Sequence, residues 1–187
     1  MIIIDENGAQ GAELDDLGYI KRRVGIGRII LPVTRYLRAV NAERYIDRGE
    51  QLLDIGCGDG YFIKRSKCKK RYGLDKLLGD EVTSALDFPD AFFDYVTMLA
   101  VIEHIAEPLP LLIEICRVLK PRGRFVFTTP QKQADFFLRL YAKNIDEEHE
   151  TYFDLKRVKD LAGDMFEIRG YHTFIFGLNQ TYCLEKK

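Results

Sequence analysis

The chain has 187 residues, 47% of them apolar and 30% charged, so it fits one globular domain with a core of ordinary size. Its 28 lysines and arginines nearly balance its 29 aspartates and glutamates, and such a balance creates no strong field toward polyanions. We therefore expect no nucleic-acid partner.

The amino terminus, MIIIDENGAQ, is a short apolar run followed by acids, without the basic start and long apolar core of a secretory signal. No apolar stretch approaches membrane-spanning length, so we expect a cytoplasmic protein without a membrane span. Its cysteines are widely spaced and include no CxxC pair, which predicts reduced thiols rather than disulfides or a zinc site. They are Cys57, Cys68, Cys116 and Cys183.

Residues 13–50 mix basic and apolar residues at loosely helical intervals, which are interrupted by Gly25, Gly27 and Pro32. We predict an amphipathic helical extension that packs over the sheet edge. Two alternatives stay open: a lid over a substrate, or a surface for a membrane or a partner.

Strand-like and helix-like segments then alternate, which predicts a parallel sheet covered by helices. Apolar, β-branched and aromatic runs suit strands buried on both faces. We expect these strands over residues 51–55, 71–75, 93–101 and 123–130. Between the last two, Leu112, Ile115 and Leu119 recur at helical spacing and Pro121 and Gly123 supply a stop, which predicts a crossover helix.

The carboxyl-terminal part begins with a short predicted helix. Asp154 is its candidate N-cap, Leu155 and Val158 belong to its apolar stripe, and Gly163 ends it. Two extended runs follow, over residues 165–177 and 180–187, and the GLN stretch between them predicts a terminal antiparallel hairpin.

The stretch LLDIGCGDG, residues 52–60, ends the first of the parallel strands. Asp54 is followed by Gly56, Gly58 and Gly60, so the glycines occupy a βα turn at the carboxyl end of a strand, where open α/β sheets bind ligands. The dinucleotide fingerprint GxGxxG needs a glycine at position 61, but Tyr61 stands there. This difference argues against a pyrophosphate ligand such as that of NAD.

These residues resemble the first motif of class I S-adenosylmethionine-dependent methyltransferases, which is an acid, one residue and GxGxG. YGLD, residues 72–75, looks like the second motif, and LDFPDAFFDYVTMLAVIEHI resembles the end of the third strand and the fourth strand. EICRVLKPRGRFVFTTP resembles the next helix and the fifth strand of the members that act on small molecules.

The resemblance implies a Rossmann-like doubly wound fold: a mostly parallel sheet with a carboxyl-terminal antiparallel strand and helices on both faces. It also implies S-adenosylmethionine as cofactor and a small or medium-sized molecule as methyl acceptor. We expect a single domain with a helical extension or lid over residues 1–48, a cofactor-binding half over 49–130 and an acceptor side over 131–187.

Five of the expected cofactor residues lie in or next to the two motifs. Gly56 and Gly58 would bring the backbone close to the ligand, because a side chain there would displace it. Cys57 belongs to the same loop as a small filler. Asp54 would fix the loop or receive the ligand's ammonium group. Asp75, at the end of the next strand, would accept the ribose hydroxyls; the alternative is an acid that caps the following turn.

The adenine side departs from the family. The connections after residues 60 and 75 are short, so the helix after the second strand should be reduced to a turn or missing. No acid stands where members often contact the adenine amine. We expect backbone and apolar contacts from Ala85, Leu86 and Leu99, with Lys76 along the adenine edge.

Methyl transfer depends mainly on alignment and desolvation, so a dedicated base is optional. The catalytic candidate is His104, in VIEHI just beyond the fourth strand; equally, it and Glu103 could only stabilise the turn there. His149 fits a solvated acidic loop better than a pocket, and His172 fits a structural place in a strand. No group of residues has a metal-ligand spacing, so no metal is expected.

Residues 131–153 and the amino-terminal segment should form the acceptor pocket, because the cofactor strands leave only these pieces to cover the methyl group. Phe136, Phe137, Tyr141 and Tyr152 hint at an apolar or ring-bearing acceptor. Two other classes stay open: a module that binds S-adenosylmethionine without transferring its methyl group, and an NAD-dependent oxidoreductase.

Overall fold

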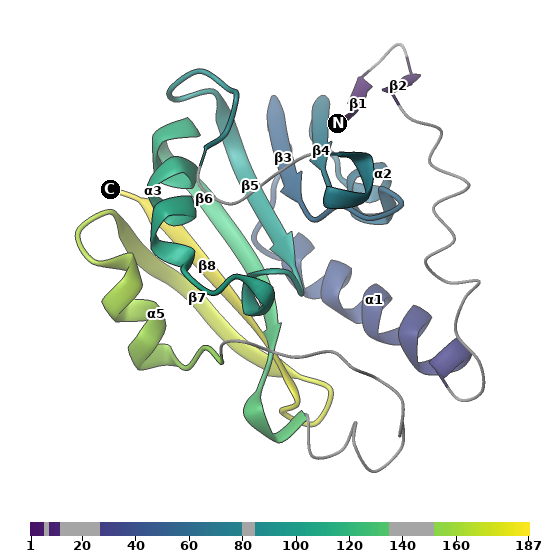
Figure 1. Cartoon of the computed structure of the whole chain (residues 1–187), viewed down its shortest axis with the longest axis vertical. Helices are drawn as coiled ribbons and strands as arrows, with labels where there is room; N and C mark the ends of the chain where they lie inside the picture. Colours follow the sequence, from purple (N-terminus) through teal and green to yellow (C-terminus); the bar gives the residue numbers. More distant parts are fainter. Residues whose placement is uncertain (6–7, 12–26, 80–84, 135–151) are drawn as a thin grey trace.

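A computed structural model describes residues 1–5, 8–11, 27–79, 85–134 and 152–187. These residues form one eight-stranded sheet with helices on both faces (Figure 1). The strands are β1 (Ile2–Asp5), β2 (Gly8–Gly11), β3 (Gln51–Ile55), β4 (Lys70–Leu74), β5 (Phe93–Leu99), β6 (Leu119–Pro130), β7 (Phe166–Phe174) and β8 (Asn179–Lys186). The α-helices are α1 (Gly27–Glu43), α2 (Tyr61–Arg65), α3 (Pro108–Val118) and α5 (Leu155–Ala162), with 3-10 turns η2 (Lys76–Leu78) and η3 (Ile102–His104).

The strand order is β2-β1-β4-β3-β5-β6-β8-β7. The central four strands, β4, β3, β5 and β6, are parallel, so their carboxyl ends meet at one edge of the sheet. Both flanks are antiparallel, with β8 and β7 on one side and β1 and β2 on the other. The predicted Rossmann-like class is confirmed, including its carboxyl-terminal antiparallel strands.

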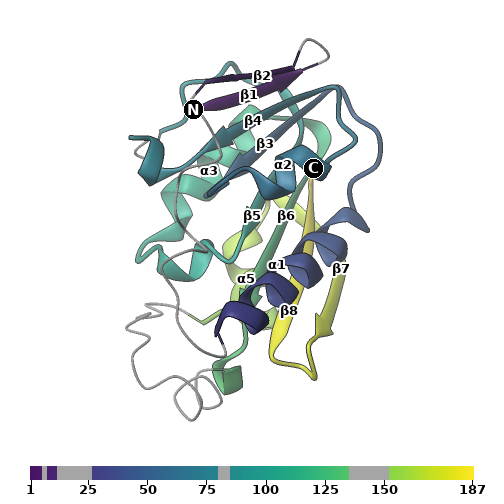
Figure 2. The same cartoon turned by 90° about the vertical axis from the view of Figure 1, so that its right-hand side faces the viewer.

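The amino-terminal hairpin was not expected from the sequence. β1 pairs antiparallel with β4, with Ile2 opposite Gly73 and Ile4 opposite Arg71, and both isoleucines are buried. The extension thus begins as a hairpin rather than a helix, and Figure 2 shows it closing the edge beside β4.

The predicted end of a third parallel strand in the LDFPD stretch is wrong, because residues 85–92 contain no strand.

Two apolar layers cover the sheet. On one face, α3 and α5 pack on the inward side chains of the central strands, which include Phe93, Met98 and Phe127. On the other face, α1 and α2 cover a second cluster that includes Leu52, Ile63 and Val126 (Figures 1 and 2). Pro32 lies within α1 and does not end it, contrary to the interruption expected there.

Strand β6 begins earlier than predicted. It starts at Leu119, directly after α3, because Leu119 is fully buried and pairs with Phe93. The expected stop residues instead make an irregularity inside the strand, where Arg122 has a φ of 61° and a Cβ on Gly123 would meet the Lys120 carbonyl at 2.9 Å. The short helix α5 agrees with the prediction: the Asp154 carboxylate accepts the Arg157 N–H at 2.7 Å.

Candidate functional site

The glycine loop is bound tightly to the end of β4. The backbone N–H groups of Gly56 and Cys57 both donate to the Leu74 carbonyl, at 2.7 and 3.1 Å. Gly56 has a φ of +76°, and a Cβ there would lie 2.2 Å from Cγ2 of Val101. Glycine at position 56 is therefore required by Val101 and by its own backbone, and its expected close approach to the cofactor stays a prediction.

Gly58 differs from Gly56, because a Cβ built on it would meet nothing within 4 Å. Its φ is +54°, and its N–H donates to Oδ2 of Asp75 at 2.8 Å. The open space above this residue fits a ligand that approaches the backbone closely. The hydrogen bond also joins the two predicted motifs into one site.

Asp54 is a buried acid, with only 2% of its surface exposed. The Thr97 hydroxyl donates to its Oδ1 at 2.6 Å. Burial raises the pKa of Asp54 to about 7; the bond from Thr97 opposes this change and the nearby Asp75 adds to it. A cationic group placed beside these two carboxylates would favour the ionised form of Asp54 and relieve the penalty of burying it.

The two acids beside the glycine loop decide between the two kinds of ligand that such turns bind, a pyrophosphate and S-adenosylmethionine. A pyrophosphate needs free loop amides and no anions beside it, whereas here the Gly58 N–H is taken by a carboxylate and a second acid is buried close by. An ammonium group and a ribose diol suit Asp54 and Asp75, because carboxylates accept hydrogen bonds from both. The residues present thus fit S-adenosylmethionine.

Cys57 packs on the sheet. A Cβ on Gly73 of β4 would lie 2.7 Å from the Cys57 Sγ, so the thiol fills the space that this glycine leaves. Cys57 is only 6% exposed. Its place as a small filler of the cofactor loop agrees with this packing, and a contact with the cofactor stays a prediction.

The expected adenine residues are spread around a gap in the described chain. Lys76 is exposed at the start of η2, Ala85 is exposed, and Leu99 is half-buried at the end of β5, whereas residues 80–84 lie outside the described ranges. The 3-10 turn after β4 is consistent with the reduced helix expected there. Leu86 is 4% exposed and packs in the core, so its expected adenine contact does not come from an exposed side chain.

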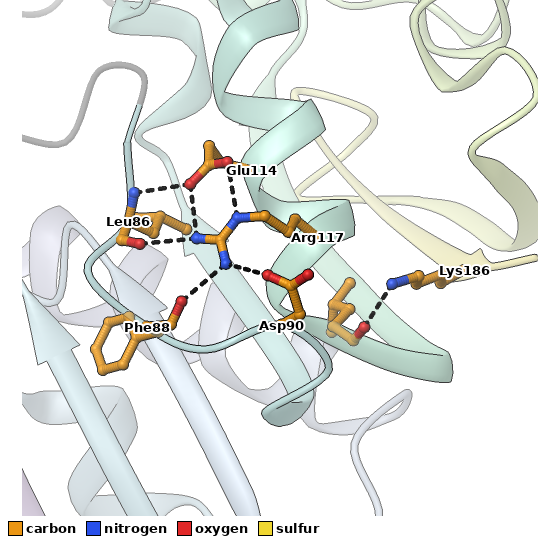
Figure 3. A network of polar contacts seen from close by, with 7 residues as sticks. Leu86, Phe88, Asp90, Glu114, Arg117 and Lys186 are labelled. Atoms are coloured by element: carbon orange, nitrogen blue, oxygen red, sulfur yellow. Dashed lines mark hydrogen bonds and ion pairs between the residues drawn. The ribbon is translucent and has the colours of Figure 1, made fainter.

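Arg117 of α3 holds the segment that carries Leu86 (Figure 3). Its guanidinium donates to the carbonyls of Leu86 and Phe88, each at 2.8 Å, and to Asp90 at 2.6 Å. It also forms a double contact with Glu114, which in turn accepts the Leu86 N–H at 3.0 Å. These side chains hold residues 86–90 in place through hydrogen bonds, and both backbone groups of Leu86 are engaged. The bonds from Arg117 lower the pKa of Glu114 to about 2.

His104 lies at the same edge of the sheet as the glycine loop. It ends η3, just beyond β5, and its side chain is exposed, whereas Glu103 beside it is buried. The His104 N–H donates to the Val101 carbonyl at 3.0 Å, so its backbone stabilises the turn. A catalytic role for its imidazole stays a prediction.

The other two histidines differ from His104. His149 lies outside the described residues. His172 is on β7 and bridges to the opposite helix: Nε2 is 2.6 Å from Oδ1 of Asn41, and Nδ1 is 3.1 Å from the Tyr45 hydroxyl. Because an amide oxygen only accepts, Nε2 carries the proton and Nδ1 accepts from Tyr45. Burial lowers the pKa of His172, in line with the structural place expected for it.

Sequence reasoning missed three residues around the loop. Thr97 bonds Asp54, Val101 packs on Gly56, and Arg35 of α1 pairs with Asp59 at 2.9 Å. Thr97 could have been found from the sheet, because the register of β3 and β5 places it opposite Asp54. No local sequence signal links Arg35 to a loop 24 residues away.

Most of the expected acceptor pocket, including Phe136, Phe137 and Tyr141, lies outside the described residues; Tyr152 is described and half-buried. Within the ranges that the structure describes, no group of three or more His, Cys, Asp or Glu residues could hold a metal ion. The same ranges contain no helix long and apolar enough to cross a membrane.

Comparison with known proteins assigns the family. The family model of a methyltransferase domain matches residues 31–165, which include the glycine loop, Asp75 and His104. The chain therefore belongs to this methyltransferase domain family. S-adenosylmethionine is the cofactor that membership of this family implies.

Curated relatives are distant. A demethylmenaquinone methyltransferase of Shouchella clausii is 30% identical over 122 residues, which are 65% of this chain and 44% of that protein. A mitochondrial ubiquinone biosynthesis O-methyltransferase of Schizosaccharomyces pombe is 27% identical over 118 residues, 50% of this chain and 43% of that one. The chain thus matches about half the length of these relatives or less.

Among solved structures, a SAM-dependent methyltransferase from Aquifex aeolicus has the same fold. Its TM-score is 0.63 at 18% identity, and the match covers 92% of this chain and 99% of that one. The class I methyltransferase fold expected from the sequence is confirmed.

Proposed function

We propose that this chain is an S-adenosylmethionine-dependent methyltransferase whose acceptor is a small or medium-sized molecule with an apolar ring. The bond from the Gly58 N–H to Asp75, beside the buried Asp54, carries the cofactor part of the proposal. The printed names of the relatives, which concern menaquinone and ubiquinone, support the acceptor part.

The bound cofactor would supply a methyl group on a sulfonium, which leaves to the acceptor as S-adenosylhomocysteine forms. The chain's own residues would bind and orient. Asp75 would hold the ribose hydroxyls while keeping the loop in place through Gly58, and Asp54 would receive the ammonium group. His104, exposed at the same edge, would take the proton that the acceptor hydroxyl or ring carbon loses.

A transfer assay tests the proposal. Purified protein is incubated with methyl-labelled S-adenosylmethionine and either 1,4-naphthalenediol or catechol, under reducing conditions, and label is counted in the organic extract. We expect label to enter at least one ring acceptor, and His104→Gln to slow transfer while leaving the affinity for S-adenosylhomocysteine unchanged.

The control is His172→Gln, which changes a histidine on β7, an edge strand of the sheet. Binding of S-adenosylhomocysteine without transfer to either ring would contradict the acceptor class and favour the non-catalytic binding module. Equal slowing by His104→Gln and His172→Gln would contradict the role of His104.

A further inference from the structure

Three side chains join the outer end of the glycine loop to helix α1. Nη2 of Arg35 lies 2.9 Å from Oδ2 of Asp59, and the Arg35 guanidinium carbon lies 4.0 Å from the centre of the Tyr61 ring. The other carboxylate oxygen of Asp59 accepts the Tyr61 N–H at 3.2 Å. The side chains of Arg35 and Asp59 are 25% and 29% exposed, so solvent only partly screens the pair.

The loop needs such a contact because its own backbone is permissive. Gly58 and Gly60 both have positive φ, and α2, which follows, has five residues and no side-chain cap. The inner half of the loop is fixed by bonds to Leu74 and Asp75 of the neighbouring strand end. The outer half, from Asp59 to Tyr61, is fixed from another element by Arg35.

We propose that Arg35 is a positioning residue that holds the outer half of the cofactor loop in its binding shape, so that helix α1 sets the affinity for the cofactor. The inference rests on the proposed function, since it concerns the same site. Arg35 does not have to touch the cofactor; it acts through Asp59 and Tyr61.

An ion pair between α1 and α2, outside the glycine loop, provides a matched control. Arg65 contacts Glu43 through Nε at 2.9 Å and Nη2 at 3.1 Å, and both side chains are 33% exposed. Glu43 is bonded to the end of α2 rather than to the glycine loop. Glu43→Gln therefore weakens the packing of the same two helices and leaves the contact of Arg35 with Asp59 intact.

The experiment is calorimetric titration of S-adenosylhomocysteine into the whole chain and its variants, with thermal melts to confirm that each is folded. Arg35→Gln removes the ion pair and the ring contact, and we expect its Kd to rise about five- to tenfold, the combined size of a partly exposed ion pair and a cation–π contact. Asp59→Asn keeps an oxygen for the Tyr61 N–H but loses the charge, and its Kd should rise about threefold.

Two further variants separate positioning from general stability. If Arg35 acts through Asp59, the double variant Arg35→Gln/Asp59→Asn should bind no more weakly than Arg35→Gln alone, within about twofold. Arg35→Lys keeps the positive charge but loses the guanidinium over the Tyr61 ring, so its Kd should fall between those of the wild type and Arg35→Gln. Glu43→Gln should bind within about 1.5-fold of the wild type.

Equal weakening by Arg35→Gln and Glu43→Gln would overturn the proposal, because helix packing alone would then explain the effect. So would an unchanged Kd for a folded Arg35→Gln. A wild-type protein that does not bind S-adenosylhomocysteine would refute the proposed function itself, an outcome distinct from both.

Discussion

Replacing Asp54 by asparagine should stabilise the protein without ligand at neutral and basic pH. Burial raises the pKa of this carboxyl from 3.8 to about 7. Because the folded pKa lies above the unfolded one, the penalty for the ionised acid is absent below pH 3.8, grows as the pH rises to about 7, and is then constant. A difference of about 3 between the folded and the unfolded pKa corresponds to at most about 4 kcal/mol of unfolding free energy.

Part of this gain is lost in the variant. The side-chain oxygen of the introduced asparagine can still accept from Thr97, but its amide N–H groups must find partners in a buried place, which costs about 1–3 kcal/mol. The net gain at pH 8 should be about 1–3 kcal/mol. Between pH 5 and pH 7 the difference from the wild type should grow by about 1 kcal/mol per pH unit.

Urea unfolding at pH 5, 6, 7 and 8 measures these differences. The control is Asp160→Asn, which changes an exposed acid on α5 and should follow the wild type at every pH. An Asp54→Asn variant that is less stable than the wild type at pH 8, or a difference that does not depend on pH, would contradict a penalty from the buried Asp54 carboxylate.

Three smaller predictions concern left-handed backbone positions and a helix cap. Gly56→Ala should lower the unfolding free energy by at least about 2 kcal/mol, because its Cβ would collide with Val101. Gly58→Ala should lower it by only about 1 kcal/mol and should mainly weaken S-adenosylhomocysteine binding. Equal losses of stability in the two variants would contradict this difference. Ala100→Gly should raise the unfolding free energy by about 0.5–1 kcal/mol, because residue 100 has a φ of +59°; a lower melting temperature would argue against strain there. Asp154→Ala should cost about 1 kcal/mol in urea unfolding through the lost N-cap of α5, and an unchanged midpoint would show that the cap contributes nothing.

The parallel centre of the sheet could be predicted because its signals are local. The strand over residues 51–55 was predicted with its observed bounds, and α5 with its Asp154 cap follows from a few neighbouring residues. The hairpin of β1 and β2 could not be predicted in this way. Three isoleucines are a weak pattern, and their place is decided by pairing with β4, which lies about 70 residues further along the chain.

For the same reason, some residues of the candidate site could be predicted from the sequence and others could not. Motif spacing placed Asp54, the glycines and Asp75 at one edge, and the structure brings them together through the bond between Gly58 and Asp75. It could not reveal Arg35, because that contact depends on how α1 packs over the loop. Nor could it show that both backbone groups of Leu86 are engaged by Arg117 and Glu114.

The acids around the glycine loop should bind a cationic nucleoside cofactor and disfavour a pyrophosphate. Calorimetric titration of the wild type with S-adenosylhomocysteine and with NAD tests it most directly, with Asp75→Asn and the control Asp160→Asn alongside. We expect saturable binding of S-adenosylhomocysteine, no binding of NAD, and at least tenfold weaker binding by Asp75→Asn, since hydrogen bonds to a charged acceptor are worth about 1.5–3 kcal/mol. Binding of NAD in preference, or an Asp75→Asn variant that binds as tightly as the wild type, would contradict it.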